Sequence, residues 1–149
     1  MISVLRRLTL YSLVLGVIIV TRLGLWMLRY QTVRAWLVRP CREDPQPERR
    51  LAVYHVARVV ARLARLIPDA SCLTQSIACQ AVLSWRNIPS SISMGVKKED
   101  GGTLRWHAWV TWNDVIILEG NEEVLAGFQK LLDLPTPVRA QGSRPSTSP

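Results

Sequence analysis

Apolar positions dominate the first forty residues of the chain and predict helices there. Residues 8–21 are fourteen uncharged, strongly apolar positions, Arg22 interrupts them, and residues 23–28 continue the run. This uncharged run falls short of the ~20 residues that a membrane-spanning helix needs, whereas the window 8–28 is long enough if Arg22 reaches the interface. No small-residue cleavage site follows, so a secretory signal is not predicted. Two interpretations stay open: a membrane-associated helix, or a helix buried against the rest of the protein or a partner.

The clearest helical pattern covers residues 48–67. Arg58, Arg62 and Arg65 share one side of this predicted helix with His55, and apolar residues at helical spacing form the other side. The apolar positions are Ala52, Val56, Val59, Val60, Leu63 and Ile67. We predict that the apolar side joins the core and that the three arginines form a basic stripe, which faces solvent or a docking partner.

A second core helix and a small antiparallel sheet are predicted after Pro68, which ends the first helix. Asp69 or Ser71 can cap a helix from residue 72 to about residue 85, and Asn87 suits its end. Alternating or apolar runs predict strands at 91–98, 104–112 and 115–119, with turns at 99–102 and 113–114. Residues 122–132, with Asn121 as cap, predict a closing helix. The predicted fold class is therefore α+β.

The chain divides into four predicted segments. Residues 1–39 form an apolar, basic helical region, and the proline-rich residues 40–47 form a linker. Residues 48–134 form the core domain, and the Pro/Ser/Thr/Gly-rich residues 135–149 are predicted to be a disordered tail. A chain of 149 residues has room for one domain and an appendage.

The positive charge of the chain lies in its first half. Residues 1–70 hold twelve arginines and four acidic residues, whereas residues 71–149 hold seven basic and seven acidic residues. Such a basic block favours an anionic membrane face, a nucleic acid or an acidic protein. The chain has no zinc-finger spacing, basic zipper or aromatic RNA-binding motif, so a nucleic-acid partner is not predicted.

The cysteines predict neither disulfides nor a metal centre. Cys41, Cys72 and Cys79 are an odd number without an export signal, which indicates a reducing, cytoplasmic compartment, with or without membrane contact. No Cys-x-x-Cys occurs, and neither histidine lies beside a cysteine pair, so no metal or other cofactor is predicted. Cys41, in the proline-rich linker, is interpreted as an incidental free thiol.

Cys72 is the candidate nucleophile. It stands at the start of a predicted helix, where backbone amide dipoles favour a negatively charged thiolate. Cys79 lies two turns further along among apolar neighbours and is predicted to be a buried structural residue.

His107, in the strand 104–112, is the candidate base that takes the thiol proton and later protonates the leaving amine. This hypothesis requires the ring of His107 on the same side of the sheet as the sulfur of Cys72.

Glu119 is the candidate acid that orients the imidazole. Asp114, at the hairpin tip, lies about 20 Å along the chain from His107, which is too far. A three-residue loop at 112–114 places Glu119 opposite His107 on the same face, whereas a two-residue turn at 113–114 directs Glu119 to the other face. A triad that includes Glu119 therefore requires the three-residue loop at 112–114.

Four short motifs resemble a known family when they are taken in order. They are Cys-Leu-x-x-Ser-x-Ala at 72–78, Ile-Pro at 88–89, Gly-Val at 95–96 and His-Ala-Trp-Val at 107–110. Over about residues 52–132 the chain resembles the transglutaminase-like, papain-like core of the lasso-peptide B-type leader peptidases. The resemblance implies a catalytic triad of Cys72, His107 and Glu119, although the family usually carries Asp in place of Glu119 and Arg in place of Gln75.

The resemblance also implies a function and partners. It implies a cysteine endopeptidase that removes the leader from a ribosomally made lasso precursor before a separate cyclase closes the ring. The first 70 residues show no winged-helix pattern, so the chain resembles the split catalytic form, which works with a separate leader-binding protein. Gln75, Trp109 and the basic stripe of Arg58, Arg62 and Arg65 are candidate docking residues. Two other functions stay open: acyl transfer of the transglutaminase or amidase type, and a non-catalytic, membrane-associated scaffold.

Overall fold

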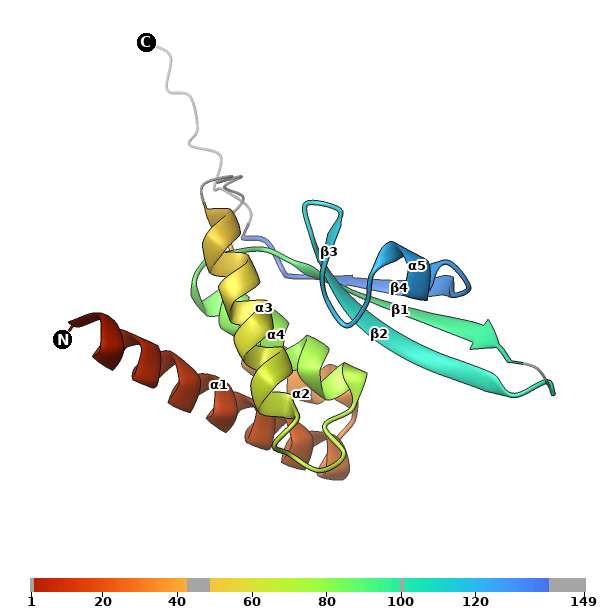
Figure 1. The fold of residues 1–149 in the computed structure, drawn as a ribbon, viewed down its shortest axis with the longest axis horizontal. Coiled ribbons are helices and arrows are strands. Elements are labelled where there is room, and N and C mark those ends of the chain that lie inside the picture. The colour runs from red at the N-terminus through yellow and green to blue at the C-terminus, as the bar shows by residue number, and fades with distance from the viewer. Residues whose placement is uncertain (1, 43–48, 100, 140–149) are drawn as a thin grey trace, which may run out of the picture.

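A layer of helices covers one face of a four-stranded sheet (Figure 1). The structure is a computed structural model that describes residues 2–42, 49–99 and 101–139. Its helices are α1 (Ile2–Met27), α2 (Tyr30–Leu37), α3 (Arg50–Ala64), α4 (Cys72–Trp85) and α5 (Glu122–Leu125). Its strands are β1 (Ser91–Lys98), β2 (Leu104–Trp112), β3 (Val115–Leu118) and β4 (Gln129–Pro135). This arrangement confirms the predicted α+β class.

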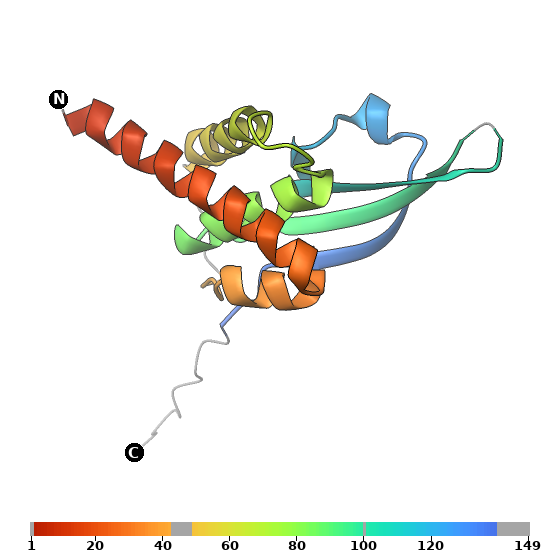
Figure 2. The same ribbon diagram turned by 90° about the horizontal axis from the view of Figure 1, so that it is seen from below.

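The sheet is antiparallel throughout, with the strand order β3-β2-β1-β4. Side chains of alternate residues face the helices, and Ala108, Val110 and Trp112 of β2 join the hydrophobic core together with Ile92 of β1 and Leu118 of β3. Helix α4 packs against β1 and β2, and α3 packs against β3. The hairpin β1–β2 extends beyond the helices in both views (Figures 1 and 2).

The N-terminal helix is part of this domain. Helix α1 packs against α3 and α4 on the outer side of the helical layer (Figure 2). One stripe of α1, at helical spacing, is buried in the core and consists of Leu10, Val14, Val17, Ile18 and Thr21. Within the predicted apolar region 1–39, the described residues form the two helices α1 and α2, and α1 packs against the core helices α3 and α4.

Helix α3 carries the predicted core face and the predicted basic stripe. Val56, Val59, Val60 and Leu63 are buried, as the helical spacing predicts, whereas Arg58 and Arg62 are exposed. Arg65 is also exposed, at the position that follows the last helical residue. The basic stripe therefore lies on the solvent face of the domain.

The prediction of a closing helix over residues 122–132 is wrong. Helix α5 ends at Leu125, and the chain then forms the edge strand β4, which pairs with β1. Asn121 does cap α5, because its side chain accepts a hydrogen bond from the Val124 amide at 2.8 Å. The short helix gives way to a strand because the open edge of β1 offers backbone hydrogen bonds to the residues that follow Gly127.

The boundary predicted between the core and the tail is also wrong. Thr136 is buried, and Val138 forms a parallel bridge with Cys41, which is itself fully buried. The interpretation of Cys41 as an incidental linker thiol is therefore corrected, because the bridge and the core enclose it. Residues 43–47 of the predicted linker and 140–149 of the predicted tail lie outside the described residues.

A buried polar network joins α2, α4 and β4. The Gln80 side chain is fully buried, and its Nε2 donates to the carbonyls of Ser90 at 3.0 Å and Leu134 at 2.8 Å. Its Oε1 accepts from Nε of Arg34 at 2.8 Å, and the Arg34 guanidinium also donates to the carbonyl of Leu134 at 3.1 Å. Burial lowers the pKa of Arg34. These bonds fix β4, and so the end of the sheet, against the helical layer.

Candidate functional site

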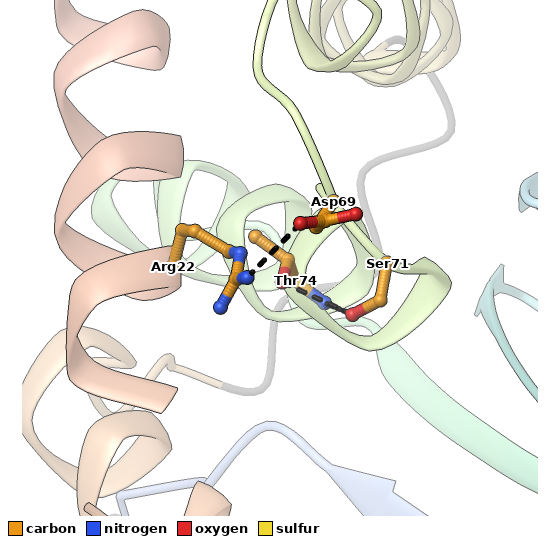
Figure 3. A network of polar contacts seen from close by, with 4 residues as sticks. All are labelled: Arg22, Asp69, Ser71 and Thr74. Atoms are coloured by element: carbon orange, nitrogen blue, oxygen red, sulfur yellow. Dashed lines mark hydrogen bonds and ion pairs between the residues drawn. The ribbon is translucent and has the colours of Figure 1, made fainter. Parts of the chain in front are cut away.

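Cys72 is the first residue of α4, and the loop before it is held by polar contacts. The Ser71 side chain caps α4 by accepting from the Thr74 amide at 3.4 Å, and the two hydroxyls lie 3.1 Å apart (Figure 3). Asp69, in a left-handed conformation, forms an ion pair of 3.7 Å with Arg22 of α1. The predicted cap by Ser71 is confirmed, and the Arg22–Asp69 ion pair connects α1 to the loop before α4.

Cys72 differs from the other two cysteines in its exposure. Cys72 is partly exposed, whereas Cys41 and Cys79 are buried. Burial raises the pKa of Cys79 to about 12 and also raises that of Cys41. A buried thiol with a raised pKa is a poor nucleophile, so Cys72 is the cysteine whose surroundings allow it to react.

His107 is held by the segment that follows β3. Its Nε2 lies 2.5 Å from the backbone carbonyl oxygen of Glu119. Because a carbonyl oxygen only accepts, Nε2 carries the proton in this hydrogen bond, and Nδ1 of a neutral ring is left as the basic nitrogen. The ring also stacks near Trp109, with centroids 6.3 Å apart, and near Phe128, with centroids 5.5 Å apart.

Glu119 contacts His107 through its backbone. The turn has two residues, Asn113 and Asp114, both with positive φ, so the predicted three-residue loop is wrong. A register shift between Val110 and Thr111 compensates for the shorter turn. Val110 pairs with Leu118, so Glu119, which follows Leu118, lies on the same face of the sheet as His107. Glu119 has a φ of 64°, and its half-buried side chain makes no hydrogen bond with the described residues.

The environment of the Glu119 carboxyl raises its pKa. Burial is the larger cause and raises the pKa, and the nearby His107 opposes the shift by lowering it. The carboxyl is therefore close enough to the imidazole to interact electrostatically, while the orienting hydrogen bond comes from the main chain.

Replacing Glu119 by Gln should raise the free energy of unfolding at neutral pH. The folded state binds the Glu119 proton more tightly than the unfolded state, so wild-type stability falls as pH rises from the unfolded pKa through the raised folded pKa. Glutamine does not ionise and lacks this penalty, so the advantage of Glu119→Gln should shrink as pH falls. Urea unfolding at several pH values measures the difference, with the exposed Glu123→Gln as matched control. A less stable Glu119→Gln at neutral pH would contradict the prediction.

No hydrogen bond joins Cys72 to His107 in the part of the chain that the structure describes. Cys72 packs against the hydrophobic core, which also includes Ala108 of β2. Alternation along β2 places the His107 side chain on the face opposite to Ala108, where its ring contacts Phe128. The triad of Cys72, His107 and Glu119 therefore stays a prediction.

A cavity of about 210 Å³ opens beside His107. It lies between the sheet and the segment that leads from β3 to β4, and its lining consists of Lys97, Glu99, Arg105, His107, Val124 and Phe128. Arg105 and Glu99 form an ion pair of 3.3 Å at its border. The sequence pattern missed Phe128 and this cavity because the segment was predicted to be helical; Gly127, before Phe128, is the signal that could have ended the helix earlier.

The candidate docking residues have different surroundings. Gln75 donates to the backbone carbonyl of Ala70 at 3.2 Å, so it braces the loop before Cys72. Trp109 is only 6% exposed and packs over Gly95, where a Cβ would lie 3.0 Å from the indole. A docking role for Trp109 is therefore wrong in this conformation, whereas Arg58, Arg62 and Arg65 are accessible.

The described residues contain no group of three or more His, Cys, Asp or Glu side chains that could hold a metal ion. Among protein families, the model described as Transglutaminase-like superfamily matches residues 15–133. Comparison with curated proteins and with solved structures finds no match. The matched range begins within α1 and ends within β4, so it covers Cys72, His107 and Glu119.

Proposed function

The chain belongs to the transglutaminase-like superfamily, which includes cysteine peptidases and acyltransferases, and on that premise we propose that it is a cysteine endopeptidase. Its proposed substrate is the precursor of a lasso peptide, from which it removes the leader. The observation that carries the proposal is the position of Cys72: it is a partly exposed thiol in the capped first turn of α4, whereas Cys41 and Cys79 are buried.

The proposed reaction has two steps. The Cys72 sulfur loses its proton to the base and attacks the scissile carbonyl, the C–N bond breaks, and the leaving amine takes the proton from the base. Water then attacks the thioester carbonyl, the C–S bond breaks, and the thiol is restored with release of the leader carboxylate. Backbone amides at the start of α4 are available to stabilise negative charge on sulfur.

The proposed base is His107, and its position sets a condition on the mechanism. Nδ1 is the nitrogen left free by the hydrogen bond to Glu119, but no hydrogen bond joins the ring to Cys72 among the described residues. Catalysis by this pair therefore requires β2, or the segment from Glu119 to Phe128, to bring the ring to the thiol when substrate or a partner binds. The uncovered end of the β1–β2 hairpin is the part of the sheet least restrained by helices (Figure 1).

The proposed partners are the precursor and a separate leader-binding protein. The exposed basic stripe of Arg58, Arg62 and Arg65 offers charge for an acidic partner surface. A helix face that contacts only solvent would expose these three arginines equally. The docking role is therefore tested by comparing precursor cleavage with and without the leader-binding protein.

Product analysis separates peptidase activity from acyl transfer, which uses the same thioester with an amine in place of water. The chain is incubated with a lasso precursor and its leader-binding protein, and the products are examined by mass spectrometry. Two peptides whose masses sum to the precursor plus one water support the peptidase. A cross-linked product or a deamidated side chain would replace the peptidase by an acyltransferase or amidase.

A second candidate function is a non-catalytic scaffold, and the lack of a hydrogen bond between Cys72 and His107 in the described part of the chain favours it. A thiol with no base beside it should react with iodoacetamide no faster than a model thiol near neutral pH. Slow alkylation together with no cleavage in the presence of precursor and partner would favour the scaffold. Fast alkylation confined to Cys72 would support the peptidase.

A further inference from the structure

The outer side of α1 is an apolar face that none of the described residues covers. Its residues lie opposite the buried stripe of Leu10, Val14, Val17, Ile18 and Thr21 and are each at least 40% exposed: Leu5, Leu8, Leu13, Ile19, Val20, Leu23, Trp26 and Met27. We call these eight residues the apolar face of α1. A continuous exposed patch of this kind on one helix indicates an interaction site.

Helix α2 extends this face. Trp36 is 77% exposed and Trp26 is 78% exposed, on two helices that pack against each other. Between the helices lies a groove of about 360 Å³ whose lining is almost entirely apolar: Val20, Leu23, Gly24, Met27, Leu28, Val33, Trp36 and Leu37. Exposed tryptophan beside aliphatic side chains is typical of residues at a membrane–water interface.

The charge around the face indicates which surface covers it. Residues 1–42 hold seven arginines and no acidic residue. Arg7, at the start of α1, and Arg29 and Arg39, at the two ends of α2, are exposed. Cations that border an exposed apolar face complement a lipid surface with negatively charged headgroups. We propose that α1 and α2 dock this domain on an anionic membrane surface, with α1 lying in the membrane plane.

The packing of α1 distinguishes a helix that docks in the plane of the membrane from one that spans it. The window Arg7–Met27 is long and apolar enough to cross a membrane by length and composition. However, Val14, Ile18 and Thr21 are fully buried in the domain, and Arg22 pairs with Asp69 before α4. Crossing the membrane would remove this stripe from the core and break that ion pair, whereas docking in the plane uses only the apolar face and leaves both intact.

Flotation with lipid vesicles tests the proposal on the full chain. We expect the wild type to float with vesicles of phosphatidylcholine and phosphatidylglycerol, and to float less with phosphatidylcholine alone or at high salt. Leu23→Glu should weaken binding at least about tenfold, because it places a charge in the apolar face. Leu51→Glu is the matched control: Leu51 is 85% exposed on α3, outside the face, and its replacement should leave binding unchanged.

Spin labels measure the depth of α1. Cysteines are introduced at Leu8, Gly16 and Leu23 in the Cys72→Ala background; a side chain at Gly16 meets nothing within 4 Å. A helix in the plane places all three labels at one shallow depth, whereas a spanning helix places the label at 16 deeper than the other two.

Three results would overturn the proposal. The first is no flotation with anionic vesicles, or equal flotation of wild type and Leu23→Glu. The second is the depth profile of a spanning helix. The third is a dimer in solution that Leu23→Glu dissociates while vesicles fail to bind, which would assign the face to a second copy of this chain. Loss of peptidase activity is not used as a readout, so these outcomes are independent of the proposed function.

Discussion

Cys72→Ala should abolish cleavage of the precursor, with a loss of at least about 10³-fold in kcat/KM. Alanine cannot form the thioester, and no other cysteine is placed to replace it, since Cys41 and Cys79 are buried. The side chain of Cys72 is partly exposed at the start of α4, so its removal should leave the fold unchanged. Initial rates of leader release, measured by mass spectrometry, give the activity, and circular dichroism gives the fold.

The control for this experiment is Cys79→Ala in the same helix. Cys79 is fully buried two turns further along, so its replacement should cost some stability by removing a packed sulfur but should leave cleavage by the folded protein unchanged. If Cys72→Ala cleaved the precursor as fast as the wild type, Cys72 would not be the nucleophile. If Cys79→Ala alone were inactive while folded, the assignment would move to Cys79.

Gln80→Leu should lower the free energy of unfolding by about 3 kcal/mol. Leucine has a similar size but neither donates to the carbonyls of Ser90 and Leu134 nor accepts from Nε of Arg34. The half-buried guanidinium would then face an apolar side chain, which adds a desolvation cost to the lost hydrogen bonds. Urea denaturation at neutral pH measures the change.

Gln75→Leu is the matched control, because it makes the same substitution in the same helix. Gln75 is only partly buried and makes one hydrogen bond, to the carbonyl of Ala70, so we expect a loss of at most about 1 kcal/mol. Equal losses for the two variants would mean that the network between α2, α4 and β4 contributes nothing beyond an ordinary hydrogen bond.

The elements built from local interactions could be predicted from the sequence. The cap at Ser71, the left-handed end at Asn87 and the apolar face of α3 all depend on neighbours within a few residues, and the structure contains each of them. The three strands from 91 to 118 also follow from alternation and turn residues. The resemblance to a transglutaminase-like core rests on these local motifs, and the family match agrees with it at the level of the superfamily.

The elements that depend on distant partners could not be predicted in the same way. Residues 129–132 are predicted as the end of a helix, but they belong to strand β4, which completes the sheet because β1 has an open edge beside it. The register shift near Val110 also had no local signal, and it returns Glu119 to the His107 face despite the two-residue turn. Hydrogen bonding across strands decides both features, and it overrides weak local preference.

Local pattern thus determined the helix that carries Cys72, the alternation that separates His107 from Ala108, and the basic character of the N-terminal half. Tertiary packing alone decided which face of the sheet the helices cover, and hence that the His107 ring contacts Phe128 on the face opposite to Ala108. It also decided that one side of α1 is buried and the other exposed. The reason is that each strand and each helix has two sides that could be buried, and only contact with other elements determines which side is buried away from water.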